Sequence, residues 1–214
     1  MLDRFTWFRQ AAFRYAGEGR TIYIDPWGTD EGAQRADLIL ITHAHEDHLQ
    51  PDEIARLSAG GAKIVAPHDV AAELSGDVTP VAPGESHEVA GVKFTTVPAY
   101  NIAEERLQMH PKSNNWVGYV LELPEGIYFH AGDTDHTPEL DDVKTDVAFL
   151  PIGGTYTMDA AEAAGLAKSI GPKIAVPMHY GFVVGSPSDA GRFKDAAAPV
   201  EVQVLTPTNP FEQA

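Results

Sequence analysis

The stretch "LILITHAHEDHLQP" covers residues 38–51. A run of aliphatic residues precedes His43, His45, Asp47 and His48, so a buried strand is predicted to end just before these side chains. The carboxyl end of a strand is where α/β folds place their sites. In extended chain alternate residues share a face, so His43 and His45 can converge on one ion. A tight turn after them can direct Asp47 and His48 toward a second ion.

Imidazole and carboxylate groups are good ligands for zinc and its neighbours. The chain has no cysteine, which excludes disulfides and thiolate ligands and leaves His, Asp, Glu or water. An ordinary cluster of satisfied histidines is the alternative, and the spacing after an aliphatic strand disfavours it. Glu46, inside the motif, is interpreted as a spacer.

The bulk composition is that of a globular protein. The chain has 214 residues and 43% hydrophobic residues, which predicts a single domain over residues 1–214. The first 20 residues carry acids and arginines, which is unlike a signal peptide, and no apolar run approaches the roughly 20 residues that span a bilayer. We therefore expect a cytoplasmic protein without membrane contact. The net charge of −16 disfavours nucleic acid as a partner.

Short β-type runs alternate with Gly, Pro and Asp along the chain. Strands are predicted at residues 21–24, 38–41, 63–66, 92–97, 117–123, 127–130, 147–150, 174–176 and 200–205. Helices are predicted at residues 52–58, 69–74 and 157–170, and after Ser188. This order predicts two mixed sheets packed together with helices outside.

The motif H-x-H-x-D-H in "THAHEDH" resembles the signature of the metallo-β-lactamase superfamily of hydrolases. Three stretches agree with it: "YIDPWG" (23–28), "IYFHAGDTD" (127–135) and "VPMHYG" (176–181). "GDTD", "PIGGTYTMDAAEAA" and "PMHYG" look closest to the branch with ascorbate-6-phosphate lactonase-like and N-acyl-phosphatidylethanolamine phospholipase D-like proteins. The resemblance spans roughly residues 5–185. It implies an α/β fold, a four-layer αβ/βα sandwich of two mixed β-sheets with the site at one edge.

The resemblance also implies a ligand set for two divalent ions, foremost zinc, with manganese or iron as alternatives. One ion would take His43 and His45, the other Asp47, His48 and His179, and Asp133 would bridge them. Both distant ligands follow predicted strands, which agrees with this assignment.

The first ion lacks a third ligand in this scheme. The superfamily usually supplies a histidine near "VPAYN" (97–101), where this chain has Asn101. His110 is assigned instead, within a loop over residues 101–115 that is expected to fold over the site. The alternatives are that Asn101 or water fills the place, or that only one ion binds tightly.

Two further residues are candidates to lie behind the ligands. Asp25, at the end of "TIYID", is expected to hold a ligand imidazole in its tautomer, with a simple turn residue as the alternative. His130 either faces the site or packs in the core.

Four residues are candidates to bind substrate. Thr155 and Tyr156 precede a predicted helix whose N-terminus favours anions. Lys112 could bind an anionic group, and Tyr180 could donate to an oxyanion. The alternative for the stretch with Thr155 and Tyr156 is simple helix capping, that for Lys112 is a solvated lysine, and that for Tyr180 is core packing.

We therefore expect a metal-dependent hydrolase in which two ions hold a hydroxide that attacks an ester, lactone or phosphodiester of a small anionic substrate. Asp47 and Asp133 would lie at the reacting atoms. A nuclease or phosphodiesterase, and a metal-binding protein without catalysis, remain alternatives. Flavodiiron proteins share the fold but carry a carboxylate where this chain has His45, which favours hydrolysis. Assembly into a homo-oligomer is left open.

Overall fold

The chain forms two mixed β-sheets, as predicted, and the computed structural model describes residues 1–209. In sheet order, the first sheet contains β1 (Phe5–Trp7), β2 (Phe13–Gly17), β3 (Arg20–Ile24), β4 (Leu38–Leu40), β5 (Lys63–Pro67) and β6 (Asp77–Val81). The second contains β13 (Glu201–Val202), β12 (Ile174–Met178), β11 (Val147–Pro151), β10 (Gly126–His130), β9 (Val117–Leu123), β8 (Val92–Pro98) and β7 (Ser86–Val89). Strands β3 to β6 pair in parallel, as do β10 to β13, and the remaining pairs are antiparallel.

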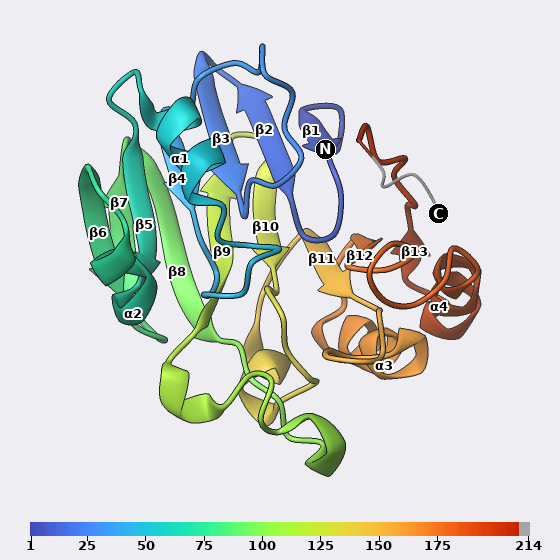
Figure 1. Cartoon of the computed structure of the whole chain (residues 1–214). Coiled ribbons are helices and arrows are strands. Elements are labelled where there is room, and N and C mark those ends of the chain that lie inside the picture. The colour runs from blue at the N-terminus through green and yellow to red at the C-terminus, as the bar shows by residue number, and fades with distance from the viewer. Residues whose placement is uncertain (210–214) are drawn as a thin grey trace.

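Helices cover the outer faces of the two sheets. Figure 1 shows α1 (Pro51–Ser58) and α2 (His68–Glu73) beside β4 to β6, and α3 (Ala160–Ile170) and α4 (Asp189–Ala197) beside β11 to β13. Three short 3₁₀ turns complete the structure: η1 (Glu104–Arg106), η2 (Lys112–Asn114) and η3 (Pro138–Asp142). Within residues 1–209, no helix has the length and apolar character needed to cross a bilayer.

Strand β4 shows why its sequence is aliphatic throughout. Leu38 and Leu40 face the core between the sheets, whereas Ile39 and the following Ile41 face the cluster under α1. A strand that is covered on both faces has no polar side, so its apolar residues run without alternation. The inter-sheet core contains aromatic rings from both sheets, and the Phe13 and Phe149 ring centroids are 4.7 Å apart.

The carboxyl ends of β3, β4, β10 and β12 meet at one edge of the sandwich. Hydrogen bonds join the sheets there: Tyr119 Oη donates to the Ile41 carbonyl at 2.7 Å, and Val117 N donates to the Thr42 carbonyl at 3.1 Å. These bonds fix the start of the 42–48 loop against the second sheet. Loops that are far apart in the sequence are thereby brought together.

Candidate metal centre

The histidine-rich loop, Asp133, His179 and His110 converge at this edge. Their donor atoms form three groups within which all atoms lie within 4.8 Å of one another: His43–His45–His110, Asp47–His48–His179 and His43–His48–Asp133. The first two groups are the two ligand sets expected for the two ions. His110 comes from the loop between η1 and η2 and is fully buried beside His43 and His45.

Asp133 lies between the two sets. Its Oδ2 atom is 3.1 Å from His179 Nε2, 3.5 Å from His48 Nε2 and 3.4 Å from His110 Nε2. Two ligands bound to one tetrahedral ion at about 2.1 Å lie roughly 3.4 Å apart. A carboxylate that contacts both sets is placed to bridge two ions.

Several of these donor atoms are buried without a partner. Among residues 1–209, His48 Nε2, His110 Nε2 and Asp133 Oδ1 accept or donate no hydrogen bond. Leaving a polar atom unpaired in the interior costs free energy, so such atoms cluster where a ligand completes them. The residues present therefore fit divalent ions.

Asp25 orients the ligands of the 42–48 loop. Its carboxylate accepts from Thr42 N at 2.7 Å, from Thr42 Oγ1 at 2.6 Å and from His48 Nδ1 at 2.7 Å. Since the single Thr42 hydroxyl hydrogen goes to Asp25, its oxygen accepts from His43 Nδ1, which is 3.0 Å away. Both imidazoles are thus protonated at Nδ1, which leaves their Nε2 atoms free for metal.

Asn101 plays the same part for His110. Asn101 Oδ1 can only accept, so His110 Nδ1 donates to it at 2.8 Å and leaves Nε2 directed at Asp133. Asn101 Nδ2 donates to Asp135 Oδ1 at 2.9 Å. Asp135 also accepts from Arg106 Nε at 2.6 Å, and Arg106 is held in turn by Glu162 of α3. The geometry therefore favours His110 over the alternative in which Asn101 itself fills the third ligand position.

The backbone at two site residues is left-handed. Asp25 has φ 47° and His179 has φ 56°, which is uncommon for residues other than glycine. Gly153 packs against the His179 carbonyl, and a Cβ there would lie 2.5 Å from that oxygen. A glycine is thus required at position 153, because any side chain there would collide with the His179 backbone.

The ionisable groups perturb one another strongly. Burial lowers the pKa of His43 well below its usual value and that of His45 to about 4, assisted by the neighbouring histidines. Burial opposes charge on His179 as well, but Asp133 and Asp47 raise its pKa to about 9. Perturbed pKa values of this kind concentrate at functional sites.

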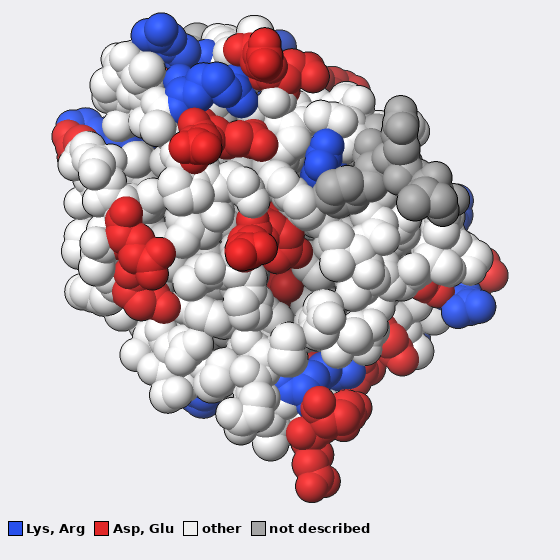
Figure 2. Space-filling model, viewed as in Figure 1, with Lys and Arg blue, Asp and Glu red and all other residues white. Residues whose placement is uncertain are grey.

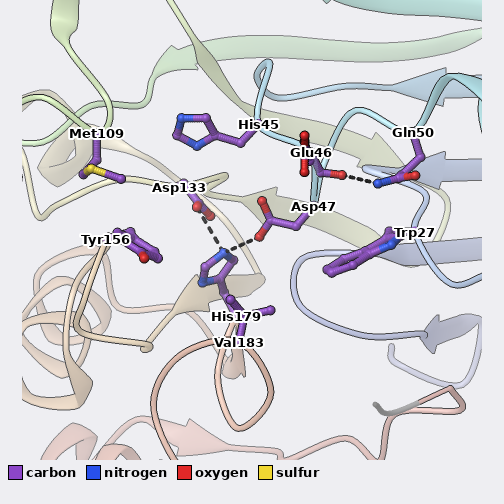
Figure 3. Close-up of a pocket in the computed structure, with 10 residues that line it drawn as sticks. All are labelled: Trp27, His45, Glu46, Asp47, Gln50, Met109, Asp133, Tyr156, His179 and Val183. Carbon is purple, nitrogen blue, oxygen red and sulfur yellow. Dashed lines mark hydrogen bonds and ion pairs between the residues drawn. The ribbon is translucent and has the colours of Figure 1, made fainter. Parts of the chain in front are cut away.

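A pocket opens above the centre. It has a cavity volume of about 420 Å³, within the range of small-molecule sites. Figure 3 shows its lining: Trp27, His45, Glu46, Asp47, Gln50, Met109, Asp133, Tyr156, His179 and Val183. Of the candidate substrate-binding residues, Tyr156 is among them.

The other candidate residues lie elsewhere. Lys112 forms an ion pair with Glu139 at 2.6 Å and lies over the Tyr100 ring, outside the pocket. Thr155 is exposed and does not line the pocket. The buried Tyr180 ring stacks on Trp7, with centroids 5.6 Å apart, so core packing describes it. None of these three residues lines the pocket, so its geometry gives no support to their predicted part in substrate binding.

His130 is a core residue rather than a neighbour of a ligand. Its Nε2 donates to the Ala11 carbonyl at 2.9 Å, and its Nδ1 accepts from Gly132 N at 3.3 Å. Both hydrogen bonds go to backbone atoms and the ring packs against Phe13 and Phe149, so core packing is the predicted alternative that describes it. It supports the turn that presents Asp133.

Sequence reasoning missed the walls of the site. The Trp116 ring centroid lies 5.0 Å from those of His43 and His45, and its Nε1 donates to Asp69 Oδ2 at 2.7 Å. Glu46, interpreted as a spacer, lines the pocket. These residues carry no spacing signal, because they meet only through the tertiary fold.

Comparison with known proteins agrees with the geometry. The family profile described as "Beta-lactamase superfamily domain" matches residues 4–179. A UPF0173 metal-dependent hydrolase of Methanopyrus kandleri is 33% identical over 98% of this chain and 100% of its own length. One from Pyrococcus horikoshii is 37% identical over 92% of this chain and 93% of its own length.

Solved structures show the same likeness. A Parabacteroides distasonis protein assigned as a metal-dependent hydrolase superposes with a TM-score of 0.84 at 32% identity, covering 94% of this chain and 91% of that chain. Igni18, a metallo hydrolase of Ignicoccus hospitalis, superposes with a TM-score of 0.76 at 27% identity. The match covers 97% of this chain and 95% of that chain. The finer likeness to the lactonase and phospholipase branch is not confirmed by these relatives. The chain belongs to the UPF0173 family of metal-dependent hydrolases, within the metallo-β-lactamase superfamily.

Proposed function

We propose that this protein hydrolyses an ester, lactone or phosphodiester bond of a small molecule with two divalent ions, foremost zinc, held at the strand ends. The observation that carries the proposal is the pair of three-residue ligand sets that share the Asp133 carboxylate. When bound, such ions lower the pKa of a water molecule and polarise the bond under attack.

The residues of the chain divide the remaining work. His43, His45 and His110 would hold one ion, Asp47, His48 and His179 the other, and Asp133 would join them. Asp47 is 22% exposed and lines the pocket, so its carboxylate is placed to pass a proton to the leaving group. Asp25, Thr42 and Asn101 keep the imidazoles aimed at the ions.

An open pocket favours catalysis over a purely structural metal site. Structural zinc sites are closed by four protein ligands, whereas catalytic sites keep a position for water or substrate. His45, Asp47, Asp133 and His179 all line the pocket as well as the ligand cluster. A non-catalytic role therefore has less support than hydrolysis.

The test is hydrolysis by purified protein that has been stripped with a chelator and then reloaded with zinc, manganese or iron(II). A panel of aryl esters, lactones and an aryl phosphodiester serves as substrate. We expect stripping to abolish turnover and reloading to restore it. Asp133→Asn should lower kcat/KM by at least about a hundredfold.

The matched control is Asp195→Asn, an exposed acid on α4. It should behave as the unmodified protein. Turnover that survives chelation, or an Asp133→Asn form as active as the control, would refute the proposal.

A further inference from the structure

The pocket above the metal centre has apolar walls. Trp27 lies on one side of the ligand cluster, with Met109 and Tyr156 opposite, and Val183 lies below His179 (Figure 3). Tyr156 is 36% exposed and Val183 is 56% exposed, so large apolar surfaces stand open at the mouth. Four chain segments supply these side chains, and they leave room for an apolar group of a substrate beside the ions.

Apart from its two histidines, the charged side chains that line the pocket are all acidic. They are Glu46, Asp47 and Asp133, and among residues 1–209 no Lys or Arg lines it. In Figure 2 a group of acidic side chains lies at the centre of this face within a largely uncharged surround. Anionic ligands are usually bound by Arg, Lys or clustered backbone N–H groups, and the lining offers no such cation.

The nearby cations are engaged elsewhere. Arg106 binds Asp135 and Glu162, and Lys112 binds Glu139. The Arg9 guanidinium lies over the Trp27 ring at 5.3 Å, and its Nε donates to the Asn209 carbonyl. None of the three is part of the lining.

Bound ions do not change this conclusion. Two divalent ions would face four carboxylates, namely Asp47, Asp133 and Glu46 in the pocket and Asp25 behind His48. These carboxylates offset the formal charge of the ions, so the pocket as a whole does not become strongly positive. The net charge of −16 acts in the same direction at longer range.

We propose that the pocket selects an uncharged carboxylic ester or lactone with an aliphatic or aromatic group, and that Glu46 at its rim rejects anionic substrates. This rests on the proposed hydrolase function and narrows it. In the reaction the acyl C–O bond breaks, the carbonyl carbon bonds to the oxygen of water, and the leaving alcohol oxygen takes a proton of that water. The expectation of an anionic substrate rested on Lys112 and on the helix N-terminus after Thr155 and Tyr156, and of these three residues only Tyr156 lines the pocket.

The experiment compares 4-nitrophenyl hexanoate with 4-nitrophenyl monoadipate, which has the same carbon count and a terminal carboxylate, and with bis(4-nitrophenyl) phosphate. We expect kcat/KM for the hexanoate to exceed both others by at least about tenfold. Glu46→Lys should lower the ratio of kcat/KM for the hexanoate to kcat/KM for the adipate by about tenfold, with the metal content unchanged. Glu88→Lys, on the exposed face of β7, is the control and should leave the ratio unchanged.

A binding measurement separates this proposal from the hydrolase function. Calorimetry with the amides N-phenylhexanamide and adipic acid monoanilide reports pocket preference without turnover. If no ester is hydrolysed, the hydrolase proposal fails, and preferential binding of the hexanamide still supports the pocket assignment. The proposal is overturned if the adipic acid monoanilide binds as tightly as the hexanamide or more tightly, or if the adipate ester is turned over as fast as the hexanoate or faster. It is also overturned if Glu46→Lys leaves the ratio of the two kcat/KM values unchanged.

Discussion

Asn101 and His110 face each other across the loop that carries both. The Asn101 side chain holds the His110 ring and is itself fixed by Asp135. Arg106 links Asp135 to Glu162 of α3, so a chain of hydrogen bonds runs from α3 to the candidate metal centre. Such partners of metal ligands typically affect metal affinity by about 10–100-fold.

Asn101→Leu should therefore weaken the binding of one of the two ions and leave the binding of the other unchanged. The substitution removes the acceptor for His110 Nδ1 while keeping a side chain of similar size. We expect a loss of about 10–100-fold in affinity for a single ion, measured by calorimetric titration of the metal-free protein. Asn114→Leu on the same loop is the control; equal affinities for both ions in the two variants would contradict the role assigned to Asn101.

The pH dependence of metal binding follows from His179 and His48. Burial opposes their charged forms, but Asp133 and Asp47 raise the pKa of His179 to about 9 and that of His48 well above its usual value. Both are thus protonated near pH 7 in the metal-free protein and must lose a proton to bind an ion. We expect proton release on binding at pH 7 and an affinity that rises with pH toward 9, measured by calorimetry in buffers of different ionisation enthalpy.

The same shifts determine the stability of the metal-free protein. A pKa raised above the unfolded value near 6.5 contributes stability that is complete below that pH and is lost as pH rises through about 9. The melting temperature of the metal-free protein should therefore fall between pH 7 and pH 9.5. A melting temperature that rises over this interval would contradict the shifts.

The candidate ligands were predictable from the sequence where they lie close together along the chain or directly follow a predicted strand. His43, His45, Asp47 and His48 lie within one short loop, and His179 follows a strand whose sequence is aliphatic. The pocket walls were not predictable, because residues such as Trp27 and Met109 are far apart in the sequence and come to line one pocket only in the folded protein.

At the level of elements, α3 has the clearest local signals. The Asp159 carboxylate accepts from Ala161 N and Glu162 N, each at 2.8 Å. The Glu162 carboxylate in turn accepts from Asp159 N. The helix ends at Gly171, whose φ of 57° suits the left-handed position that closes a helix.

Asp159→Ala should destabilise the protein by about 1 kcal/mol, since two backbone donors of the first turn lose their acceptor. The free energy of unfolding in urea measures the change. Lys168→Ala, exposed on the same helix, should change it by less than about 0.5 kcal/mol. Equal effects of the two substitutions would show that the capping box contributes little.

The strands that the sequence did not predict are mostly at sheet edges. β1, β6 and β7 are edge strands, and β6 contains Pro80, which pattern reasoning excludes from a strand. The predicted strand at 200–205 is shortened to Glu201–Val202, also at an edge. Edge strands are half exposed and depend on a neighbour for pairing, so their sequences carry a weak pattern. β2 lies inside the first sheet but is half-exposed on one face, and it was also not predicted. The strands that are buried on both faces, such as β4 and β11, were predicted.

In the whole molecule, aromatic packing joins the two sheets. Phe149 of β11 contacts Phe5 and Phe13 of the other sheet, with ring centroids at 5.1 Å and 4.7 Å. Since the candidate ligands come from both sheets, this packing also fixes the two groups of candidate ligands relative to each other.

Phe149→Ala should lower the free energy of unfolding by about 3–5 kcal/mol, because it leaves a cavity between the sheets. Ile127→Ala, on the exposed side of β10, should cost far less. Denaturant unfolding of metal-free protein measures both. Similar values for the two substitutions would contradict the assignment of Phe149 to the shared core.

We propose that two ions share Asp133, each held by its own three residues. Native mass spectrometry of zinc-saturated protein counts the bound ions directly. We predict two ions for the unmodified chain and one each for His110→Ala and His179→Ala, which belong to different ligand sets. One ion in the unmodified chain, or two in either variant, would contradict the account.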